Sequence, residues 1–357
     1  MRIKEKTQRR LRNFLIVFAI ICLTPLCEKG RMLSGADSAN AFAGEELICA
    51  IDLGEGMYGS YGLETGLNYE LLQKFAKDNH CNVKVVATNK NFNFIDSLSA
   101  GKIDMVITRN KGIYEGNRQT VAQNINGYSE WVIAGKELNE ARQLETWVGH
   151  LKASEEFESI KSKYSGTFNP HKRAERGVRT KTVSPYDDLF RKYAKQLGWD
   201  WRMLAAVVYQ ESKFSIGSRS YRGAQGLMQV MPQTGKVYGI DNLLDPEENI
   251  IAGTNHLKRL QKMLSKDAFE HEELIKFTLA AYNAGEGRVT DCRNLATAKG
   301  FDDTKWDDIL QVIPLMRDDA IYKEPSVKLG KFQGYETIDY VESVLSHYRA
   351  ICEITSL

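Results

Sequence analysis

The sequence predicts an α/β domain followed by a mainly α-helical domain. Strand-like and helix-like segments alternate between residues 47 and 108, which is the pattern of a parallel sheet with crossover helices. From Pro185 onward the apolar spacing is helical and few strand-like runs occur. Between these regions, residues 161–181 contain seven Lys or Arg and one Glu, which indicates a linker and a domain boundary near residues 170–182. The linker is expected to be a solvated, flexible tether, and the alternative is electrostatic docking on anionic wall polymer or lipid headgroups.

The length and composition fit two globular domains and do not indicate a particular class of binding partner. The chain has 357 residues, of which 43% are apolar and 26% charged, and this excludes a mainly disordered, collagen-like or disulfide-knot protein. The formal net charge of +2 gives no overall field that would indicate a nucleic acid partner. The six cysteines include no CxxC pair, so the sequence predicts no metal site of that type.

Residues 1–43 are predicted to form a signal or an N-terminal membrane anchor with a spacer. Residues 1–13 contain six Lys or Arg and one Glu, and Phe14–Leu26 is an uncharged apolar run. A basic start followed by such a run is typical of a secretion signal, and the run is shorter than the roughly 20 residues that a spanning helix needs. The chain from residue 44 onward is therefore expected to work outside the cytoplasmic membrane, either free or attached through the N-terminal segment.

The cysteines of this exported part allow two disulfides. Cys49 lies in one strand-like run and Cys81 begins the next, so a Cys49–Cys81 bridge is one hypothesis. Cys292–Cys352 is a second. Both pairs are equally compatible with buried thiols.

The first domain, residues 44–168, is expected to contain four strands and three helices. Apolar runs predict the strands, at residues 47–53, 83–87, 103–108 and 131–134. Apolar residues at helical spacing predict the helices, at residues 69–79, 94–100 and 141–164. Gly101 is the stop signal of the second helix.

This domain resembles the periplasmic solute-binding proteins that bind amino acids. The resemblance rests on LICAIDL, YELLQKFAKDN and FIDSLSAGKIDMVIT within residues 47–108, and on the returning strand and closing helix within residues 128–164. Those proteins have two lobes, but only 19 residues separate Thr108 from Tyr128 here, and a domain needs about 50. The resemblance therefore implies a single periplasmic-binding-protein-like lobe. It is either a sensor or docking module whose small-molecule ligand the sequence does not specify, or a scaffold for the second domain.

A glutamate on an apolar helix face is the main catalytic candidate. Asp200 is a favourable N-cap for a helix over residues 201–212. One face of that helix carries, at i, i+3, i+4 and i+7, Leu204, Val207, Val208 and Glu211. Desolvation there raises the pKa of a carboxyl, which suits a general acid that protonates a glycosidic oxygen. A glutamate paired to Arg219 or Arg222 would show the same spacing.

Three ordered motifs extend this argument. They are ESKFSIGSRSYRGAQGLMQVMPQT at residues 211–234, AAYNAG at 280–285 and ETIDYV at 336–341. Together they resemble the lysozyme-like catalytic domain of bacterial lytic transglycosylases, which would occupy residues 184–357 after a basic linker at 169–183. The resemblance implies a mainly α lysozyme-like fold in the periplasm, free or attached to a membrane. It also implies cleavage of the MurNAc–GlcNAc β-1,4 bond of peptidoglycan glycan strands, with formation of 1,6-anhydro-MurNAc, in cell-wall turnover or remodelling. No metal or other cofactor is implied.

The motifs assign a role to single residues. Glu211 matches the catalytic acid and base of the family, and the substrate-binding positions are Ser220, Met228, Gln229, Tyr282, Asn283, Glu336 and Tyr340. Met228 is expected as a hydrophobic wall, and Tyr282 as a donor to Glu211 or to the sugar. Asn283 and Gln229 offer amide groups for N-acetyl and hydroxyl groups. For each of these positions the alternative is a buried polar residue that satisfies a turn.

The number of carboxylates separates two mechanisms. Hydrolytic glycosidases use two, and the motifs supply one. The resemblance implies that the N-acetyl group of the substrate replaces the second, while Glu211 protonates the leaving oxygen and then accepts the proton of the C6 hydroxyl. The alternative is a goose-type-lysozyme-like hydrolase, with a second carboxylate among Asp245, Glu248 and Glu286. A non-catalytic wall-binding protein is a third hypothesis, which the complete motif set disfavours.

Overall fold

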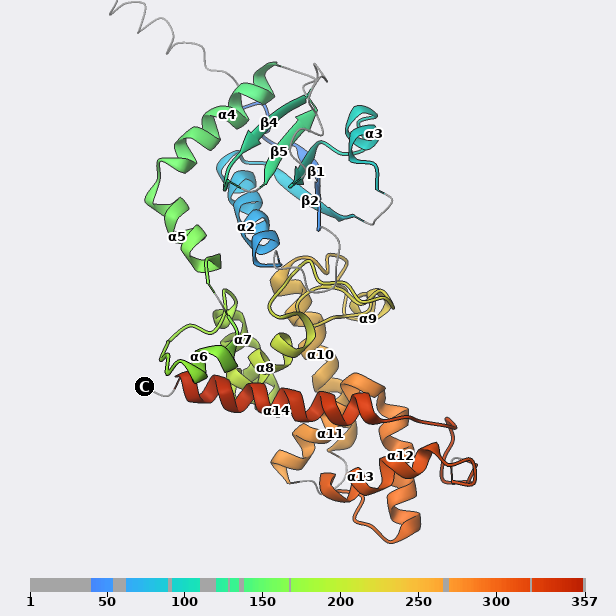
Figure 1. Cartoon of the computed structure of the whole chain (residues 1–357). Coiled ribbons are helices and arrows are strands. Elements are labelled where there is room, and N and C mark those ends of the chain that lie inside the picture. Colours follow the sequence, from blue (N-terminus) through green and yellow to red (C-terminus); the bar gives the residue numbers. More distant parts are fainter. Residues whose placement is uncertain are drawn as a thin grey trace, which may run out of the picture.

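The computed structural model describes residues 40–53, 62–88, 92–109, 120–127, 129–134, 138–166, 168–265, 270–321 and 323–355. An α/β unit lies at one end of the elongated molecule and a helical unit at the other (Figure 1). Nearly all of the predicted signal or anchor lies outside the described residues. Within them, the helices are too short or too polar to cross a membrane.

The α/β unit is built on a five-stranded mixed sheet in the order β2-β1-β3-β5-β4. Its strands are β1 (Glu46–Ile51), β2 (Asn82–Ala87), β3 (Met105–Thr108), β4 (Thr120–Asn124) and β5 (Glu130–Ala134). The first three are parallel, but β5 is antiparallel to both β3 and β4. The prediction of a parallel sheet is therefore wrong for this edge, and β4 was not predicted. A connection of five residues joins β4 to β5, too short for the crossover that parallel strands need.

Helices cover both faces of the sheet. On one face, α2 (Gly62–Asp78) and α4 (Leu138–Lys152) pack over alternate strand residues such as Cys49. On the other face, α3 (Phe94–Ser99) packs over residues such as Ala50. In the larger core, the rings of Phe75 and Trp147 meet edge to face with centroids 5.0 Å apart. The core between these layers fixes the orientation of the sheet. One end of its parallel strands faces the helical unit (Figure 1).

The single helix predicted at residues 141–164 is two helices. α4 ends at Lys152, and α5 (Glu155–Tyr164) begins after Ser154. The Ser154 hydroxyl accepts a hydrogen bond from the Phe157 amide at 3.2 Å, so it starts a new helix instead of continuing the old one.

The basic segment after α5 is folded onto the helical unit, in contrast to the solvated tether that its composition indicates. It contains α6 (Pro170–Glu175), and His171 Nε2 lies 2.7 Å from Nδ1 of His347 on α14 (Tyr335–Thr355). Further along, the Thr180 amide donates to the Ile354 carbonyl at 2.8 Å. Backbone and side-chain bonds therefore fix the path of this segment.

The helical unit surrounds one almost completely buried helix, α8 (Trp201–Ser212). Its other helices are α7 (Asp187–Ala194), α9 (Pro232–Val237), α10 (Pro246–Leu264), α11 (His271–Ala284), α12 (Glu286–Lys299), α13 (Trp306–Val312) and α14, with short 3-10 turns η1 (Lys195–Leu197) and η2 (Ile313–Arg317). α14 crosses the unit and packs along α8 (Figure 1). The side chains of Leu204–Val208 are fully buried as a result.

The described cysteines are all free thiols. Neither Cys49–Cys81 nor Cys292–Cys352 forms a bridge. Cys49, Cys81 and Cys292 are buried, which is the behaviour of small apolar residues.

Polar and close-packed contacts join the two units. Tyr69 of α2 donates its hydroxyl to Asp245 Oδ2, just before α10, at 2.8 Å. Arg219 of the helical unit donates to the Thr88 carbonyl, after β2, at 3.1 Å. A Cβ at Gly66 would come within 2.5 Å of the Tyr186 hydroxyl, so glycine permits this approach. Side-chain hydrogen bonds and close packing thus join the two units.

Replacing Tyr69 by Phe tests this interface. The side chain is 5% exposed and its partner is a carboxylate, so loss of the hydroxyl should lower the free energy of unfolding by about 1–3 kcal/mol. Urea denaturation of the chain measures the change. Tyr221→Phe, at a fully exposed tyrosine, is the matched control and should have no effect. Equal stability of the two variants would contradict the proposed contribution of the bond.

Candidate active site

Glu211 is the penultimate residue of α8, and the chain reverses directly after it. The Asp200 carboxylate caps the start of the helix by accepting from the Arg202 amide at 2.9 Å. At the other end, Lys213 and Phe214 have positive φ angles of 53° and 65°. Phe214 is fully buried and anchors this reversal. The following residues are therefore turned back toward the end of α8 that carries Glu211.

A buried asparagine holds the loop that follows. Asn249 of α10 accepts from the Met228 amide at 2.8 Å and donates to the Gln225 carbonyl at 2.9 Å. Gly226 has a φ of +77°, and a Cβ there would overlap the Asn249 amide. Backbone hydrogen bonds of 3.0 Å in both directions join Gln225 to Val230. The GLMQ segment is consequently a fixed turn and not a mobile loop.

The carboxyl of Glu211 is set in a site that favours its protonated form. Part of the side chain is accessible, but burial of the carboxyl raises its pKa from 4.5 to about 7. Two groups oppose this rise, the Tyr340 hydroxyl, which donates to Oε1 at 2.6 Å, and the Lys213 ammonium. The rise in pKa predicted from helical spacing is what the structure shows. At neutral pH a substantial fraction of Glu211 holds a proton.

The two tyrosines beside Glu211 have different partners from those expected. Tyr340, expected as a substrate-binding residue, is the donor to Glu211 itself. Tyr282, expected as a donor to Glu211 or the sugar, donates to the Met228 carbonyl at 2.7 Å. Tyr282 still lies near the acid, because burial and the charge of Glu211 both raise the pKa of its hydroxyl. The structure therefore brings together Glu211, Tyr282 and Tyr340.

In the GLMQ turn, the side chains of Met228 and Gln229 mainly contact the protein itself and not an open surface. Met228 is fully buried and packs against Gly253 of α10, so it is a core residue and not the wall of an open cleft. The Gln229 amide donates to the carbonyls of Ser218 and Gly226, both at 3.0 Å. Its amide oxygen makes no hydrogen bond with another described residue, so it can accept one from a ligand.

Ser220, Asn283 and Glu336 lie farther out. The Ser220 hydroxyl accepts from the Ala224 amide at 2.9 Å, which is the turn-satisfying alternative considered for it. Asn283 is exposed, and its amide oxygen accepts from the Thr337 hydroxyl at 2.9 Å. Glu336 is an exposed residue in the first turn of α14. A hydrogen bond links Asn283 to α14. None of the three residues is hydrogen-bonded to the Glu211 carboxyl.

Two residues beside Glu211 or Tyr282 were not predicted. The Lys213 ammonium lowers the pKa of Glu211 and lies 4.2 Å from the centroid of the Tyr209 ring. The His256 ring on α10 lies 5.5 Å from that of Tyr282, and burial lowers its pKa. The sequence could have indicated Lys213, because it follows Glu211 by two residues at the end of the helix. His256 carried no such signal, because α10 reaches Tyr282 only through tertiary packing.

The candidates for a second carboxylate are engaged elsewhere. Asp245 accepts from Tyr69 and from the Glu248 amide, the latter at 2.8 Å. Glu248 accepts from the Asn242 amide at 3.3 Å, and Glu286 pairs with Arg259 at 2.9 Å. In the described part of the chain, no carboxylate is bonded to Glu211, and no group of three or more His, Cys, Asp or Glu could hold a metal ion.

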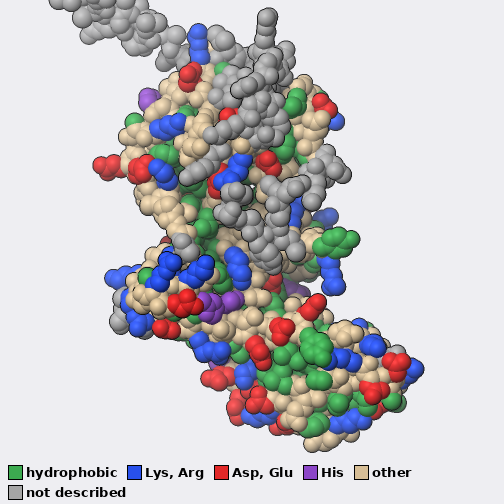
Figure 2. All heavy atoms as spheres, viewed as in Figure 1, with side chains coloured by type: hydrophobic (Ala, Val, Ile, Leu, Met, Phe, Trp, Pro, Cys, Tyr) green, Lys and Arg blue, Asp and Glu red, His purple; other side chains and the backbone are tan. Residues whose placement is uncertain are grey.

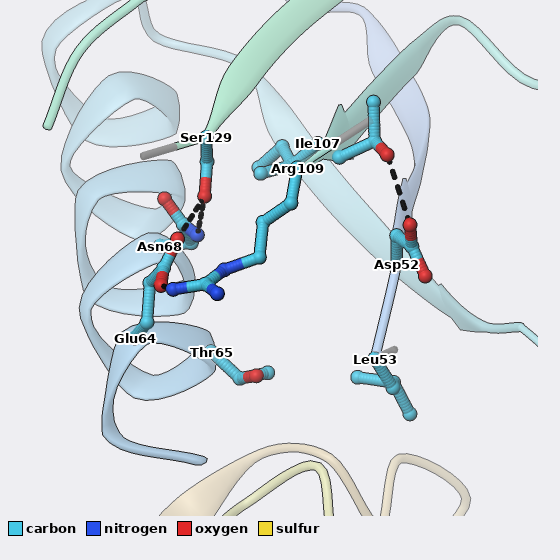
Figure 3. Close-up of a pocket in the computed structure, with 9 residues that line it drawn as sticks. Asp52, Leu53, Glu64, Thr65, Asn68, Ile107, Arg109 and Ser129 are labelled. Carbon is cyan, nitrogen blue, oxygen red and sulfur yellow. Dashed lines mark hydrogen bonds and ion pairs between the residues drawn. The ribbon is translucent and has the colours of Figure 1, made fainter. Parts of the chain in front are cut away.

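A second, small polar hollow of about 50 Å³ lies in the α/β unit, where β1 and β3 end (Figure 3). Arg109 forms an ion pair with Glu64 of α2. Ser129 donates to the same carboxylate at 2.5 Å and accepts from Asn68 at 2.9 Å. Figure 3 shows the Arg109 guanidinium crossing the hollow toward Glu64. The polar groups here are largely satisfied by one another.

Comparison with known families defines the class of the helical unit. Residues 188–305 match the family model described as the transglycosylase SLT domain. This range contains Glu211, the GLMQ turn and Tyr282, whereas Tyr340 lies beyond it. The helical unit therefore contains a mostly helical, lysozyme-like SLT domain, preceded by an α/β region.

Curated proteins of similar sequence include several with one name. The chain is 33% identical over 207 residues to the membrane-bound lytic murein transglycosylase F of Vibrio campbellii, covering 57% of this chain and 38% of the relative. The protein of the same name from Shewanella loihica is 38% identical over 163 residues, covering 46% of this chain and 33% of the relative. The chain thus spans between a third and two fifths of the length of these curated relatives.

Among solved structures, the lytic transglycosylase Slt of Pseudomonas aeruginosa aligns at 26% identity with a TM-score of 0.32, covering 46% of this chain and 24% of that one. The 70 kDa soluble lytic transglycosylase of Escherichia coli aligns at 26% identity with a TM-score of 0.31, covering 48% of this chain and 24% of that one.

The raised pKa of Glu211 predicts a pH-dependent gain in stability for Glu211→Gln. Between pH 4.5 and about 7 the folded state binds this proton more strongly than the unfolded state, so the carboxyl destabilises the fold as pH rises. A neutral amide that still accepts from Tyr340 removes this effect. The variant should be more stable than the parent by up to about 3 kcal/mol at pH 8 and equally stable at pH 4.

Denaturant unfolding at the two pH values measures this difference. Glu342→Gln, at an exposed position on α14, is the control and should leave the stability unchanged at both. A Glu211→Gln variant that is no more stable than the parent at pH 8 would show that the carboxyl is not destabilised by burial.

Proposed function

We propose that this chain is a peptidoglycan lytic transglycosylase that cleaves the MurNAc–GlcNAc β-1,4 bond and forms 1,6-anhydro-MurNAc. The observation that carries the proposal is a single carboxyl, Glu211, with a pKa near neutrality inside an SLT domain. A carboxyl with this pKa can give a proton and take one back at the same pH, which both steps of the reaction require.

The proposed chemistry uses Glu211 twice. The protonated carboxyl gives its proton to the glycosidic oxygen as the bond to the MurNAc anomeric carbon breaks. The N-acetyl oxygen of the same sugar shares its electrons with that carbon. The Glu211 carboxylate then removes the C6 hydroxyl proton, and the C6 oxygen bonds to the anomeric carbon as the bond from the N-acetyl oxygen breaks and returns its electron pair to the acetamido group. Tyr340 holds the carboxyl in one orientation throughout.

A hydrolase would need a second carboxylate to activate water. The candidates Asp245, Glu248 and Glu286 are bonded to groups other than Glu211. The charged group of the described chain that acts on Glu211 is a cation, Lys213. This arrangement supports the transglycosylase over the goose-type hydrolase.

The proposal includes the organisation of the whole chain. Residues 44–168 would form a single solute-binding-protein-like lobe, residues 169–183 the linker and residues 184–357 the catalytic domain. The chain would work in the periplasm, either free, with residues 1–43 as a signal, or attached to a membrane through them. The bond between Tyr69 and Asp245 and that between Arg219 and Thr88 favour a scaffold role for the lobe. The cell-wall turnover or remodelling inferred from the motifs, with glycan strands as the partner, is part of the same proposal.

Mass spectrometry of purified peptidoglycan digested with the purified chain tests the reaction. Products one water lighter than reducing muropeptides are expected from the parent, and Glu211→Gln should reduce their yield by at least about 100-fold, the usual contribution of general acid–base catalysis. Ordinary reducing muropeptides would establish a hydrolase instead. No product from the parent at any pH between 5 and 8 would reject the proposed activity.

Tyr340→Phe should shift the pH dependence of the reaction. The Tyr340 hydroxyl lowers the pKa of Glu211, so its removal lets the acid stay protonated to higher pH. The alkaline limb of the rate profile should therefore move to higher pH. The rate at pH 7 should fall by about tenfold, because the carboxyl loses a bond that orients it. Tyr348→Phe, on the same helix but bonded to Asp200, should leave the limb unmoved. An unshifted limb in Tyr340→Phe would mean that Glu211 does not set it.

A further inference from the structure

A cationic hollow lies at the opposite end of α8 from Glu211. It has a volume of about 240 Å³, and its lining comes from the basic segment after α6, from α7, from the start of α8 and from the end of α14. The lining residues are Lys181, Arg191, Trp201, Arg202 and Thr355. Three of these five carry a positive charge and none carries a negative charge. A hollow of this size holds a carboxylate group with its neighbouring carbon atoms.

Arg191 is held ready to bind an anion. Its guanidinium carbon lies 3.8 Å from the centroid of the Trp201 ring, so the group stacks on the indole. Among the described residues, the Arg191 guanidinium donates no hydrogen bond. Stacking occupies one face of the guanidinium and leaves the N–H groups in its plane, which is the geometry that binds both oxygens of a carboxylate.

Two acidic groups act on the charges of the hollow, Asp187, which interacts with Arg191, and Asp200, and the remaining charge is positive. The Arg202 guanidinium is paired to Asp200, with Nε at 3.0 and 2.9 Å from the two carboxylate oxygens. Lys181 is exposed and, within the described residues, makes no ion pair. Residues 169–202 contain nine Lys or Arg and four Asp or Glu. Figure 2 shows Lys and Arg side chains gathered over this side of the helical unit, beside the end of α14.

We propose that this hollow binds the carboxylates of the peptide stems that peptidoglycan carries, as a docking site separate from the candidate active site around Glu211. The inference rests on the proposed function, because it assumes the same polymer. Trp201 and Glu211 are ten residues apart on α8, which is about 15 Å along the helix. A polymer that carries stems at regular intervals can meet both sites at once. The concave shape and the stacked arginine suit a small planar anion better than the flat surface of a membrane.

Binding to insoluble peptidoglycan tests the docking site. The whole chain is used with Glu211→Gln in every sample, so that the polymer is not consumed. Sedimentation with purified sacculi should show that adding Arg191→Gln and Lys181→Gln together weakens binding by about tenfold, the loss expected for about 1.4 kcal/mol of charged hydrogen bonding. Lys195→Gln, an exposed lysine outside the hollow, is the matched control and should change binding less than twofold.

Chemical amidation of the stem carboxylates gives a second test that needs no variant of the hollow. Amidated sacculi should bind the Glu211→Gln chain about tenfold more weakly, and the Arg191→Gln, Lys181→Gln chain should show no further loss on them. Equal binding to native and amidated sacculi would overturn the proposal, even if the double variant fails to fold. A loss of binding to phosphatidylglycerol vesicles, with binding to sacculi unchanged, would overturn it in favour of a lipid surface.

These outcomes are distinguishable from a failure of the proposed function. If the parent chain releases anhydro-muropeptides but its Glu211→Gln variant binds native and amidated sacculi equally, the catalytic proposal stands and the docking site is rejected. If the parent chain releases no products but the hollow variants lose binding, the docking site stands for a wall-binding protein.

Discussion

The buried amide of Asn249 is the interaction on which the geometry of the candidate site depends. It bonds the backbone of the GLMQ turn at Gln225 and Met228, and Gly226 leaves room for it. The Met228 carbonyl then receives the Tyr282 hydroxyl, which places that tyrosine beside the acid. A donor or acceptor of the buried Asn249 amide that lost its partner would destabilise the fold by more than its hydrogen bond stabilises it. The turn therefore has one stable arrangement. The path of α10 therefore decides where the turn and Tyr282 stand.

The same packing gives the Glu211 carboxyl the intermediate acidity that the two proposed proton transfers require. Glu211 is buried enough to resist ionisation, yet Tyr340 and Lys213 keep the ionised form within reach. Burial alone would leave a carboxyl that holds its proton too tightly, and full pairing with a cation would leave one that never holds it. The described site lies between these extremes.

Local pattern was sufficient for elements whose information lies within a few residues. Helical spacing located α8 and the face that carries Glu211, and strand-like runs located β1, β2 and β3. Pairings across long stretches of sequence left no such signal. Tyr340 and Glu211 are 129 residues apart, and Tyr69 and Asp245 are 176 apart, so their bonds follow only from the assembled fold. The antiparallel edge of the sheet was missed because a short return connection, and not the composition of β5, sets its direction. Met228 was expected as a hydrophobic wall of the site but is fully buried, because a sequence motif does not distinguish a buried side chain from an exposed one.

The position of α14 has a consequence for the order in which the molecule can be completed. Residues 335–355 close over α6 and α8 and supply the hydroxyl that orients the acid. A chain still emerging during synthesis contains Glu211 and the GLMQ turn before it contains Tyr340. The orientation of the Glu211 carboxyl is therefore not fixed until α14 has docked.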